Sequence, residues 1–154
     1  MGEGKISRIN ELEIGRYVNF FENSYKDNLE HSKSNLTKFP RWAIISGYYA
    51  MHDITKLLLA KKFRIKIDFE VHATTIKVLK ELIKNKGIIS LIEEGYRNFL
   101  NLANDLDEAR RERTKVQYYT GTAFMKGEFS RKAIKFYNAA VLEYIKKIQV
   151  LLEK

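Results

Sequence analysis

Apolar residues recur at three- and four-residue intervals in five segments of the chain, the pattern of amphipathic helices. The first segment follows Asn10, a residue type that caps helix N-termini. Its apolar stripe consists of Ile14, Tyr17, Val18, Phe21, Tyr25 and Leu29. A polar stretch, 31–35, predicts the end of this helix, and Pro40 suits the first turn of the next one.

The second predicted helix, from Arg41 to about Lys62, is apolar on nearly all sides, which is typical of a helix at the centre of a bundle. Its apolar residues include Trp42, Ile44, Ile45, Tyr48, Tyr49 and Met51. The third helix is predicted from about Phe69, with Gly87 as its C-terminal stop. Its repeating positions are Val71, Thr75, Val78, Leu79 and Leu82.

A long fourth helix is predicted from near Ile88 to about Gly121, followed by a loop bracketed by Gly121 and Gly127. The fifth helix is predicted after Ser130, with the stripe Ala133, Phe136, Ala140, Val141, Tyr144, Ile148 and Leu151. Because the connections are short, successive helices should pack antiparallel. The pattern therefore predicts an all-α fold, a single up-and-down antiparallel bundle of four to five helices that spans 1–154 as one domain.

Composition narrows the class of protein. The chain has 154 residues, 45% of them hydrophobic, which supports a genuine core, and it has no cysteine. Disulfide frameworks, zinc ribbons, iron–sulfur ligation and thiol catalysis are therefore excluded. No export segment is visible, and no apolar run approaches the roughly 20 residues of a membrane-spanning helix. We expect a soluble cytoplasmic protein that has no membrane, metal or cofactor association.

The positive charge is concentrated at one end of the chain. The formal net charge is +9, from 28 basic and 19 acidic residues. From Arg110 onward there are eleven basic and four acidic residues, a net charge of +7, which leaves only +2 for the first 109 residues. Lysines of the last helix, Lys132, Lys135, Lys146 and Lys147, fall mostly off its apolar stripe and suit a solvated face. A second basic run, from Lys56 to Lys66, suits a helix end, where cations favour the macrodipole.

The fourth helix carries the most informative local feature, because its apolar stripe gives way to arginines. The stripe of Ile92, Tyr96, Phe99, Ala103 and Leu106 continues at the same spacing into Arg110, Arg113 and Gln117. Arg110 and Arg113 lie four and seven residues after Leu106, within about 40° of its direction. A buried guanidinium without a partner costs about 3–5 kcal/mol, so these side chains require an acidic or anionic partner.

Two kinds of partner satisfy that requirement equally well. Asp105, Asp107, Glu108 and Glu112 are close enough in sequence to form salt bridges within the chain or at an interface. The planar guanidinium also suits phosphate or nucleic acid. Tyr118 points about 140° away from Arg113 on a regular helix, so the two share a cleft only if the helix frays or a second subunit contributes. Core packing alone would also explain Tyr118 and Tyr119.

Several motifs recur along the chain in a recognisable order. The run from Ala43 to Met51 has the pattern A-x-x-S-x-Y-Y-A-M, and His72 is followed four residues later by Ile76. The run from Arg113 to Tyr118 has the pattern Arg-x4-Tyr, and the closing segment contains Ala133, Ala140, Tyr144 and Ile145. Together these motifs resemble small stand-alone HEPN (higher eukaryotes and prokaryotes nucleotide-binding) domains. In that family the first pattern lies in the second helix, a histidine starts the third helix, and Arg-x4-Tyr is similar to a variant of the HEPN motif.

The resemblance implies a bundle that forms a homodimer, often as an RNase toxin paired with a minimal nucleotidyltransferase antitoxin. It implies Arg113 and Tyr118 as catalytic positions. Together with the continued stripe of the fourth helix, it predicts a set of ligand-binding positions, Arg110, Arg113, Thr114, Gln117 and Tyr119. In the family, a metal-independent cleavage site combines the motif arginine with a histidine from both subunits. Here Tyr118 stands in the place of that histidine, and a phenol with a pKa of about 10 is a poor base at neutral pH.

Three functions remain open at this point. The first is a nucleotide- or RNA-binding component of a toxin–antitoxin-type system that works with a minimal nucleotidyltransferase. The second is an active metal-independent RNase, in which Arg113 stabilises charge while Tyr118 or a histidine moves protons. The third is a purely structural dimer whose arginines pair with acids. His31 is expected at an exposed helix end, and His52 and His72 are interpreted as packing residues.

Overall fold

The computed structural model describes the backbone of residues 5–68, 70–115 and 120–154, and the side chains of these ranges except 103–115 and 120–126. Four helices come first along the chain: α1 (Glu11–Ser34), α2 (Pro40–Phe63), α3 (Val71–Leu82) and α4 (Lys86–Lys115). A fifth, continuous helical segment follows, made of α5 (Thr120–Phe136), the π-helical turn η1 (Tyr137–Val141) and α6 (Leu142–Glu153). This architecture confirms the predicted all-α bundle.

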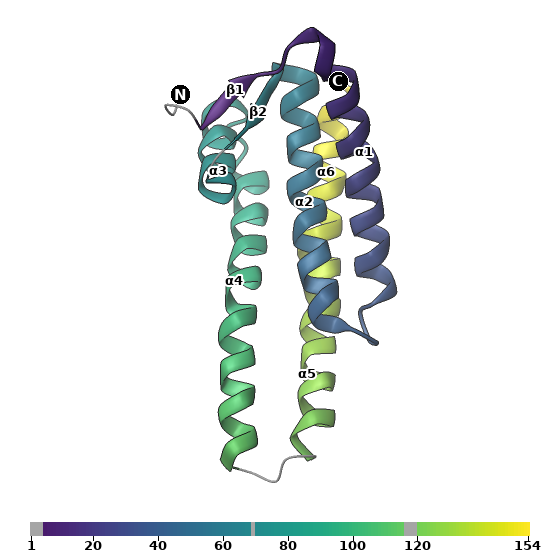
Figure 1. Ribbon diagram of the computed structural model, residues 1–154, viewed down its shortest axis with the longest axis vertical. Coiled ribbons are helices and arrows are strands. Elements are labelled where there is room, and N and C mark those ends of the chain that lie inside the picture. Colours follow the sequence, from purple (N-terminus) through teal and green to yellow (C-terminus); the bar gives the residue numbers. More distant parts are fainter. Residues whose placement is uncertain (1–4, 69, 116–119) are drawn as a thin grey trace.

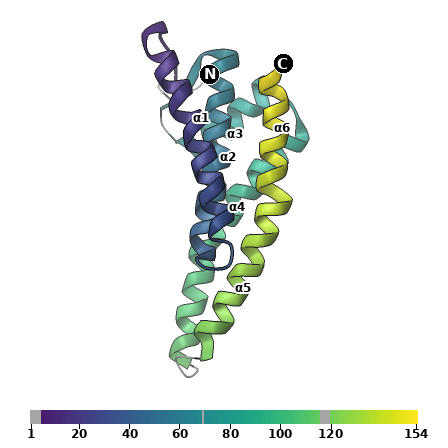
Figure 2. The ribbon, with the colours of Figure 1, turned by 90° about the vertical axis from the view of Figure 1, so that its right-hand side faces the viewer.

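The helices run up and down around a central α2. Figure 1 shows α1 antiparallel to α2 on one side, α4 on the other side, and the short α3 beside the start of α4. In the perpendicular view, the α5–α6 helix runs along the whole length of the bundle (Figure 2). The ends of α4 and α5 that flank 116–119 run past the connection between α1 and α2 in both views.

Local sequence signals explain where the first two helices begin. The Asn10 side chain accepts a hydrogen bond from the backbone N–H of Glu13 at 3.0 Å, which confirms the predicted N-cap. Pro40 occupies the first turn of α2, also as predicted. The residues 31–34 continue α1 as its last turn, so the polar stretch that was expected to end this helix belongs largely to it.

The prediction that Gly87 ends the third helix is wrong. Helix α3 ends at Leu82, and the N–H groups of Ile83 and Lys84 both bond to the carbonyl of Leu79. Lys84 turns the chain in a left-handed conformation, with φ of 57°. The Asn85 side chain then accepts from the N–H of Ile88 at 3.0 Å, as an N-cap does, so α4 begins at Lys86 and Gly87 lies in its first turn.

The predicted glycine-bracketed loop and the late start of the last helix are also wrong. The structure describes α4 as far as Lys115, and α5 includes Thr120, ten residues before the expected start of the last helix. Gly121 and Gly127 both lie inside α5. A helical glycine costs only about 1 kcal/mol relative to alanine, which neighbouring turns can offset. The π-helical turn η1 was not signalled by the periodicity.

A two-stranded antiparallel ribbon, which the periodicity of apolar residues did not predict, covers one end of the bundle. Strand β1 (Ile6–Arg8) pairs with β2 (Ile65–Ile67), with Ile6 opposite Ile67 and Arg8 opposite Ile65. Ile67 packs with Leu59 and Val78 in a small apolar cluster beneath the ribbon. The strand β2 therefore occupies the end of the basic run that was interpreted as a helix terminus.

The main core is built around α2, whose residues from Ala50 to Thr55 are all buried. A buried hydrogen bond joins α2 to α6: the Tyr144 hydroxyl and Thr55 Oγ1 lie 2.6 Å apart. Thr55 Oγ1 donates to the carbonyl of Met51 at 2.7 Å, so the Tyr144 O–H is the donor in the contact between the two hydroxyls. Burial raises the pKa of Tyr144, which keeps the phenol protonated.

Replacing Thr55 with valine should lower the free energy of unfolding by about 2 kcal/mol, because the buried Tyr144 hydroxyl loses its partner. The double variant Thr55→Val/Tyr144→Phe removes both polar groups and should be more stable than the sum of the two single changes. Urea unfolding of the four proteins measures this coupling. Strictly additive effects would contradict a hydrogen bond between the two side chains.

Candidate functional site

The structure places three of the sequence-predicted site residues, Arg110, Arg113 and Thr114, in the last six residues of α4. Their side chains, and the whole of Gln117, Tyr118 and Tyr119, lie outside the described residues. The inward direction of the arginines, and the meeting of Arg113 with Tyr118, therefore stay predictions.

The backbone nevertheless locates the arginine-bearing segment in the bundle. Ser130 Oγ donates to the carbonyl of Leu36 at 3.0 Å, which marks the level at which the α1–α2 connection meets α5. Ser130 follows Thr120 by ten residues, so about 15 Å of α5 lies beyond that level. We call Arg110–Lys115 of α4 and Thr120–Lys126 of α5 the α4–α5 extension. It runs past the ends of α1 and α2, as Figure 1 shows.

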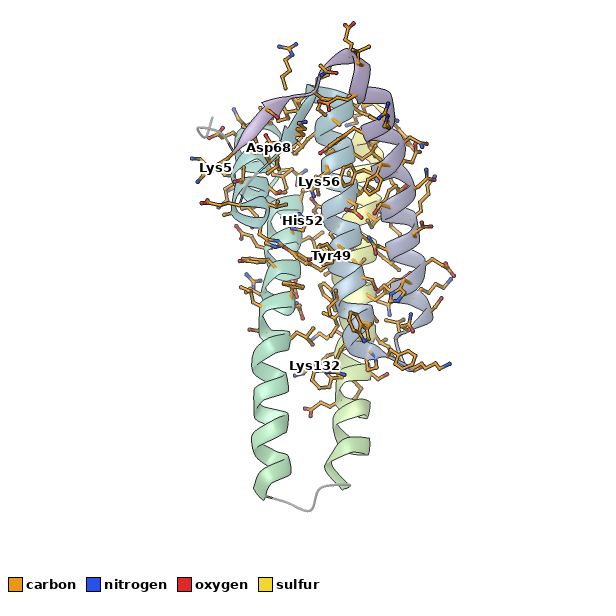
Figure 3. The ribbon with its side chains drawn as sticks, viewed as in Figure 1. Lys5, Tyr49, His52, Lys56, Asp68 and Lys132 are labelled. Atoms are coloured by element: carbon orange, nitrogen blue, oxygen red, sulfur yellow. The ribbon has the colours of Figure 1, made fainter. Side chains whose placement is uncertain are left out.

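The structure brings together a second group of polar side chains, Tyr48, His52 and His72, which we call the histidine–tyrosine cluster. Tyr48 and His52 lie one turn apart on α2, and His72 is the second residue of α3. His52 Nε2 lies 2.6 Å from Tyr48 Oη and 3.2 Å from His72 Nδ1, and Tyr48 Oη also bonds to His72 Nδ1. His52 lies on the side of α2 that faces α4 (Figure 3).

The electrostatics of the cluster keep its groups uncharged at neutral pH. Burial, with smaller contributions from His72 and Lys56, lowers the pKa of His52 to about 3. Burial, and then the charge of Lys56, also lowers the pKa of His72. Burial raises the pKa of Tyr48. Two neutral imidazoles and one neutral phenol therefore share the site.

One arrangement of the protons satisfies the hydrogen bonds among His52, Tyr48 and His72. His52 Nδ1 is buried and has no partner in the described part of the chain, so it is best left without a proton. His52 Nε2–H then donates to Tyr48 Oη, and the Tyr48 hydroxyl donates to His72 Nδ1. In this arrangement His72 carries its proton on Nε2.

Aromatic rings close the cluster on the α4 side. The His72 ring stacks on Tyr96 with a centroid distance of 5.0 Å, and Tyr48 stacks on Phe99 at 4.9 Å. Tyr48 is fully buried and His52 is 2% exposed, so a substrate cannot reach either side chain. The cluster therefore acts as a joint that holds α3 against α2 and α4, which agrees with the interpretation of His52 and His72 as packing residues.

The cluster is also far from the arginine motif. Phe99 packs against Tyr48 and His72, and Arg113 follows Phe99 by fourteen residues, about 21 Å along α4. His31 is exposed in the last turn of α1, as predicted, and its Nδ1 lies 2.9 Å from Ser46 Oγ. Within one chain, His52 and His72 are thus too distant to transfer protons beside Arg113.

A buried carboxyl group at the α1–α2 contact was missed by the sequence analysis. Asp53 accepts hydrogen bonds at Oδ2 from Ser24 Oγ at 2.6 Å and from Asn28 Nδ2 at 2.8 Å. Burial raises its pKa, against the opposing effects of these bonds and of Lys56. An acidic residue in an otherwise apolar helix was the available signal. With two donors from α1 on one oxygen, Asp53 serves the helix contact.

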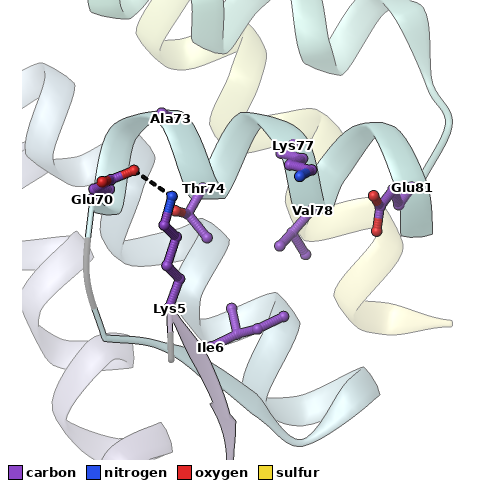
Figure 4. Close-up of a pocket in the computed structure, with 8 residues that line it drawn as sticks. All are labelled: Lys5, Ile6, Glu70, Ala73, Thr74, Lys77, Val78 and Glu81. Carbon is purple, nitrogen blue, oxygen red and sulfur yellow. Dashed lines mark hydrogen bonds and ion pairs between the residues drawn. The ribbon is translucent and has the colours of Figure 1, made fainter. Parts of the chain in front are cut away.

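A small pocket of about 90 Å³ lies between β1 and α3 (Figure 4). Its lining includes Thr74, Lys77 and Val78 of α3, and the ion pair between Lys5 Nζ and Glu70 Oε2 at 2.7 Å lies beside it. This volume holds a few water molecules at most. The pocket therefore has no room for a nucleotide.

Within the residues that the structure describes, no three histidine or carboxylate side chains are grouped so that they could hold a metal ion. The same residues contain no helix with the length and apolarity that crossing a membrane requires. Comparison of the chain with protein-family models, curated proteins and solved structures finds no match.

Proposed function

We propose that this protein binds RNA or nucleotides through Arg110 and Arg113, as a non-cleaving HEPN-like component of a toxin–antitoxin-type system. The observation that carries the proposal is the position of these arginines on the α4–α5 extension, past the ends of α1 and α2. In this region the backbones of α4 and α5 continue past the connection between α1 and α2, whereas the body of the bundle also contains α1 and α2.

The distribution of charge supports the same proposal. Lys132, Lys135, Lys146 and Lys147 are exposed on α5 and α6, as predicted for a solvated face. They account for four of the basic residues in the positive C-terminal third without implying a ligand. The remaining excess is concentrated in the extension, where Arg110, Arg111 and Arg113 occur within four residues. Clustered guanidinium groups are well suited to phosphates.

The resemblance of the 43–51 and 113–118 motifs supports a homodimer and a minimal nucleotidyltransferase partner as further parts of the proposal. In a homodimer, the two extensions would bring four motif arginines to one assembly. The partner would dock on that assembly and regulate its access to RNA.

An active RNase is the second candidate, and the geometry makes it less favourable. Cleavage beside Arg113 needs a group that moves protons near neutral pH. His52 is buried in the joint between α2, α3 and α4, and the half-buried His72 belongs to the same joint, about 21 Å along α4 from Arg113. Tyr118, the remaining candidate in the motif, has the ordinary disadvantage of a phenol with a pKa of about 10.

The variant Arg110→Gln/Arg113→Gln, which removes two positive charges, should bind a fluorescein-labelled 30-nucleotide RNA about tenfold more weakly than the wild type at 50 mM salt. The slope of log K against log[salt] should become shallower by about 1.4, because two phosphate contacts of a single strand are lost. Fluorescence anisotropy at several salt concentrations measures both quantities.

The matched control is Lys135→Gln/Lys147→Gln, which removes the same charge from exposed positions on α5 and α6. This control should retain the wild-type slope, and thermal melts should show that both variants fold. Equal affinity of the two double variants would contradict the proposal. RNA cleavage by the wild type above an Arg113→Ala control would favour the RNase, whereas dissociation of an Arg113→Ala dimer without loss of RNA affinity would favour the structural dimer.

A further inference from the structure

The strand ribbon brings together two arginines that are 56 positions apart in the sequence. Arg8 ends β1 opposite Ile65, and the N–H of Ile9 donates to the carbonyl of Arg64 at 2.8 Å. Both arginine side chains are exposed, and together they line a hollow with Ile9, Asn10 and Glu11. The ribbon lies at the end of the bundle opposite the α4–α5 extension (Figure 1).

The lysines at the ribbon form ion pairs with acidic residues, whereas within the described residues its two arginines do not. Lys5 pairs with Glu70 at 2.7 Å, and Lys66 pairs with Glu13 at 3.2 Å. In the described part of the chain, Arg8 and Arg64 form no ion pair and no side-chain hydrogen bond, although Glu11 lines the same hollow. Backbone pairing thus places Arg8 opposite Ile65 and Arg64 next to Ile9, so that both exposed arginines line one hollow. Within the described residues neither guanidinium is bound to an acidic side chain, which leaves its donors available to an anion.

Neighbouring charges strengthen the positive potential at this end. Lys61 and Lys62 are exposed in the last turn of α2, and no acidic residue occurs between Asp53 and Asp68. These lysines also form no ion pair within the described residues. Guanidinium groups bind phosphate oxygens in a bidentate manner, and nearby ammonium groups add attraction over roughly 10 Å at 0.1 M salt.

We propose that Arg8, Lys61, Lys62 and Arg64 form a second phosphate-contacting surface, which we call the ribbon-end surface, for the RNA that the extension binds. This inference rests on the proposed function and narrows its ligand. Between the two basic regions α4 runs 24 residues from Lys86 to Arg110, about 36 Å along the bundle. A single nucleotide cannot span that distance, so the ligand that uses both surfaces is an extended RNA strand.

A sharp test is available because Arg64 adopts a left-handed conformation, with φ of 55° and ψ of 38° at the C-terminal end of α2. Glycine adopts this conformation without steric cost, so Arg64→Gly removes the charge while preserving the turn. The variant Arg8→Gln/Arg64→Gly should therefore melt at or above the wild-type temperature. A loss of RNA affinity in this variant cannot then be attributed to unfolding.

The experiment measures the binding of labelled RNA strands of 6 and 30 nucleotides by fluorescence anisotropy between 50 and 200 mM salt. For the 30-nucleotide strand, Arg8→Gln/Arg64→Gly should reduce affinity about tenfold at 50 mM salt and make the salt slope shallower by about 1.4. For the 6-nucleotide strand the loss should be much smaller. The control Arg16→Gln/Lys33→Gln removes two exposed charges from α1 and should leave both affinities near the wild-type values.

Each outcome separates this inference from the proposed function. If Arg8→Gln/Arg64→Gly binds the long strand as the wild type does, while Arg110→Gln/Arg113→Gln binds it more weakly, the ribbon-end surface is rejected and the proposed function stands. Equal losses for the short and long strands would reject a single strand that spans both surfaces. If the wild type binds no RNA even at 50 mM salt, both the proposed function and this inference are rejected.

Discussion

Lowering the pH from 7 to 4.5 should reduce the free energy of unfolding by about 2.5 kcal/mol through His52 alone. In the unfolded chain this imidazole binds a proton below its ordinary pKa of about 6.5. In the folded protein, burial beside Tyr48 and His72 holds its pKa at about 3, so it remains neutral. The stability that a lowered pKa contributes is present above pH 6.5 and is lost progressively as the pH falls towards 3.

The measurement is urea unfolding of the wild type and His52→Leu at pH 7 and pH 4.5. His52→Leu removes the titrating group, so its stability should depend less on pH over this interval by about 2.5 kcal/mol. Asp53, whose raised pKa acts in the opposite direction, is present in both proteins and cancels in the comparison. The control variant is His31→Gln, which removes an exposed histidine from the last turn of α1. The same pH dependence in His52→Leu and the wild type would contradict this account.

Replacing Gly47 with leucine should destabilise the protein by about 3 kcal/mol or more, because three helical elements meet at this position. A Cβ atom built on Gly47 would lie 3.0 Å from Ser32 Oγ and 3.1 Å from Val141 Cγ2. Ser32 cannot easily give way, because it is buried and donates to the carbonyl of Ala43 at 2.7 Å. The remaining atoms of leucine would force α1 and η1 away from α2.

Gly15 offers a matched control on the neighbouring helix. A Cβ atom there meets nothing within 4 Å, so Gly15→Leu changes the same residue type on an open helix surface. Leucine should stabilise that position by up to about 1 kcal/mol, since it is the better helix former. Thermal and urea unfolding of both variants should therefore show changes of opposite sign. Similar changes at the two positions would show that backbone propensity, rather than packing against α1 and η1, governs Gly47.

Local sequence signals predicted most helices and failed where glycines were read in isolation. Asn10 and Pro40 mark helix starts because capping and the fixed φ of proline act within one turn. Gly87 and Gly121 were assigned to helix ends and Gly127 to a loop, yet all three lie in helices. The actual turn after α3 uses Lys84 in a left-handed conformation, which ordinary residue preferences disfavour.

The candidate sites also differ in whether the sequence predicted them. The arginine motif at 110–113 was visible from periodicity, because a charged residue on an apolar stripe is a local irregularity. The contacts of Asp53 with Ser24 and Asn28 join positions 25 or more residues apart, and no pattern along the chain connects them. Arg8 and Arg64 come close together through the pairing of β1 with β2. These three-residue strands are too short to show a clear alternation of apolar and polar residues in the sequence.

The sequence by itself determined that this protein is a helical bundle with a central apolar helix and a basic C-terminal third, because these properties depend on residue type and spacing along one segment. Tertiary structure alone decided that the His52 side chain contacts Tyr48 and His72 within hydrogen-bond distance. It also brought Arg8 and Arg64 to the same hollow. It also decided that the end of α4 which carries Arg110 and Arg113 runs past α1 and α2. These arrangements depend on how helices of unequal length align and where a short strand pair forms, which are set by contacts between distant segments.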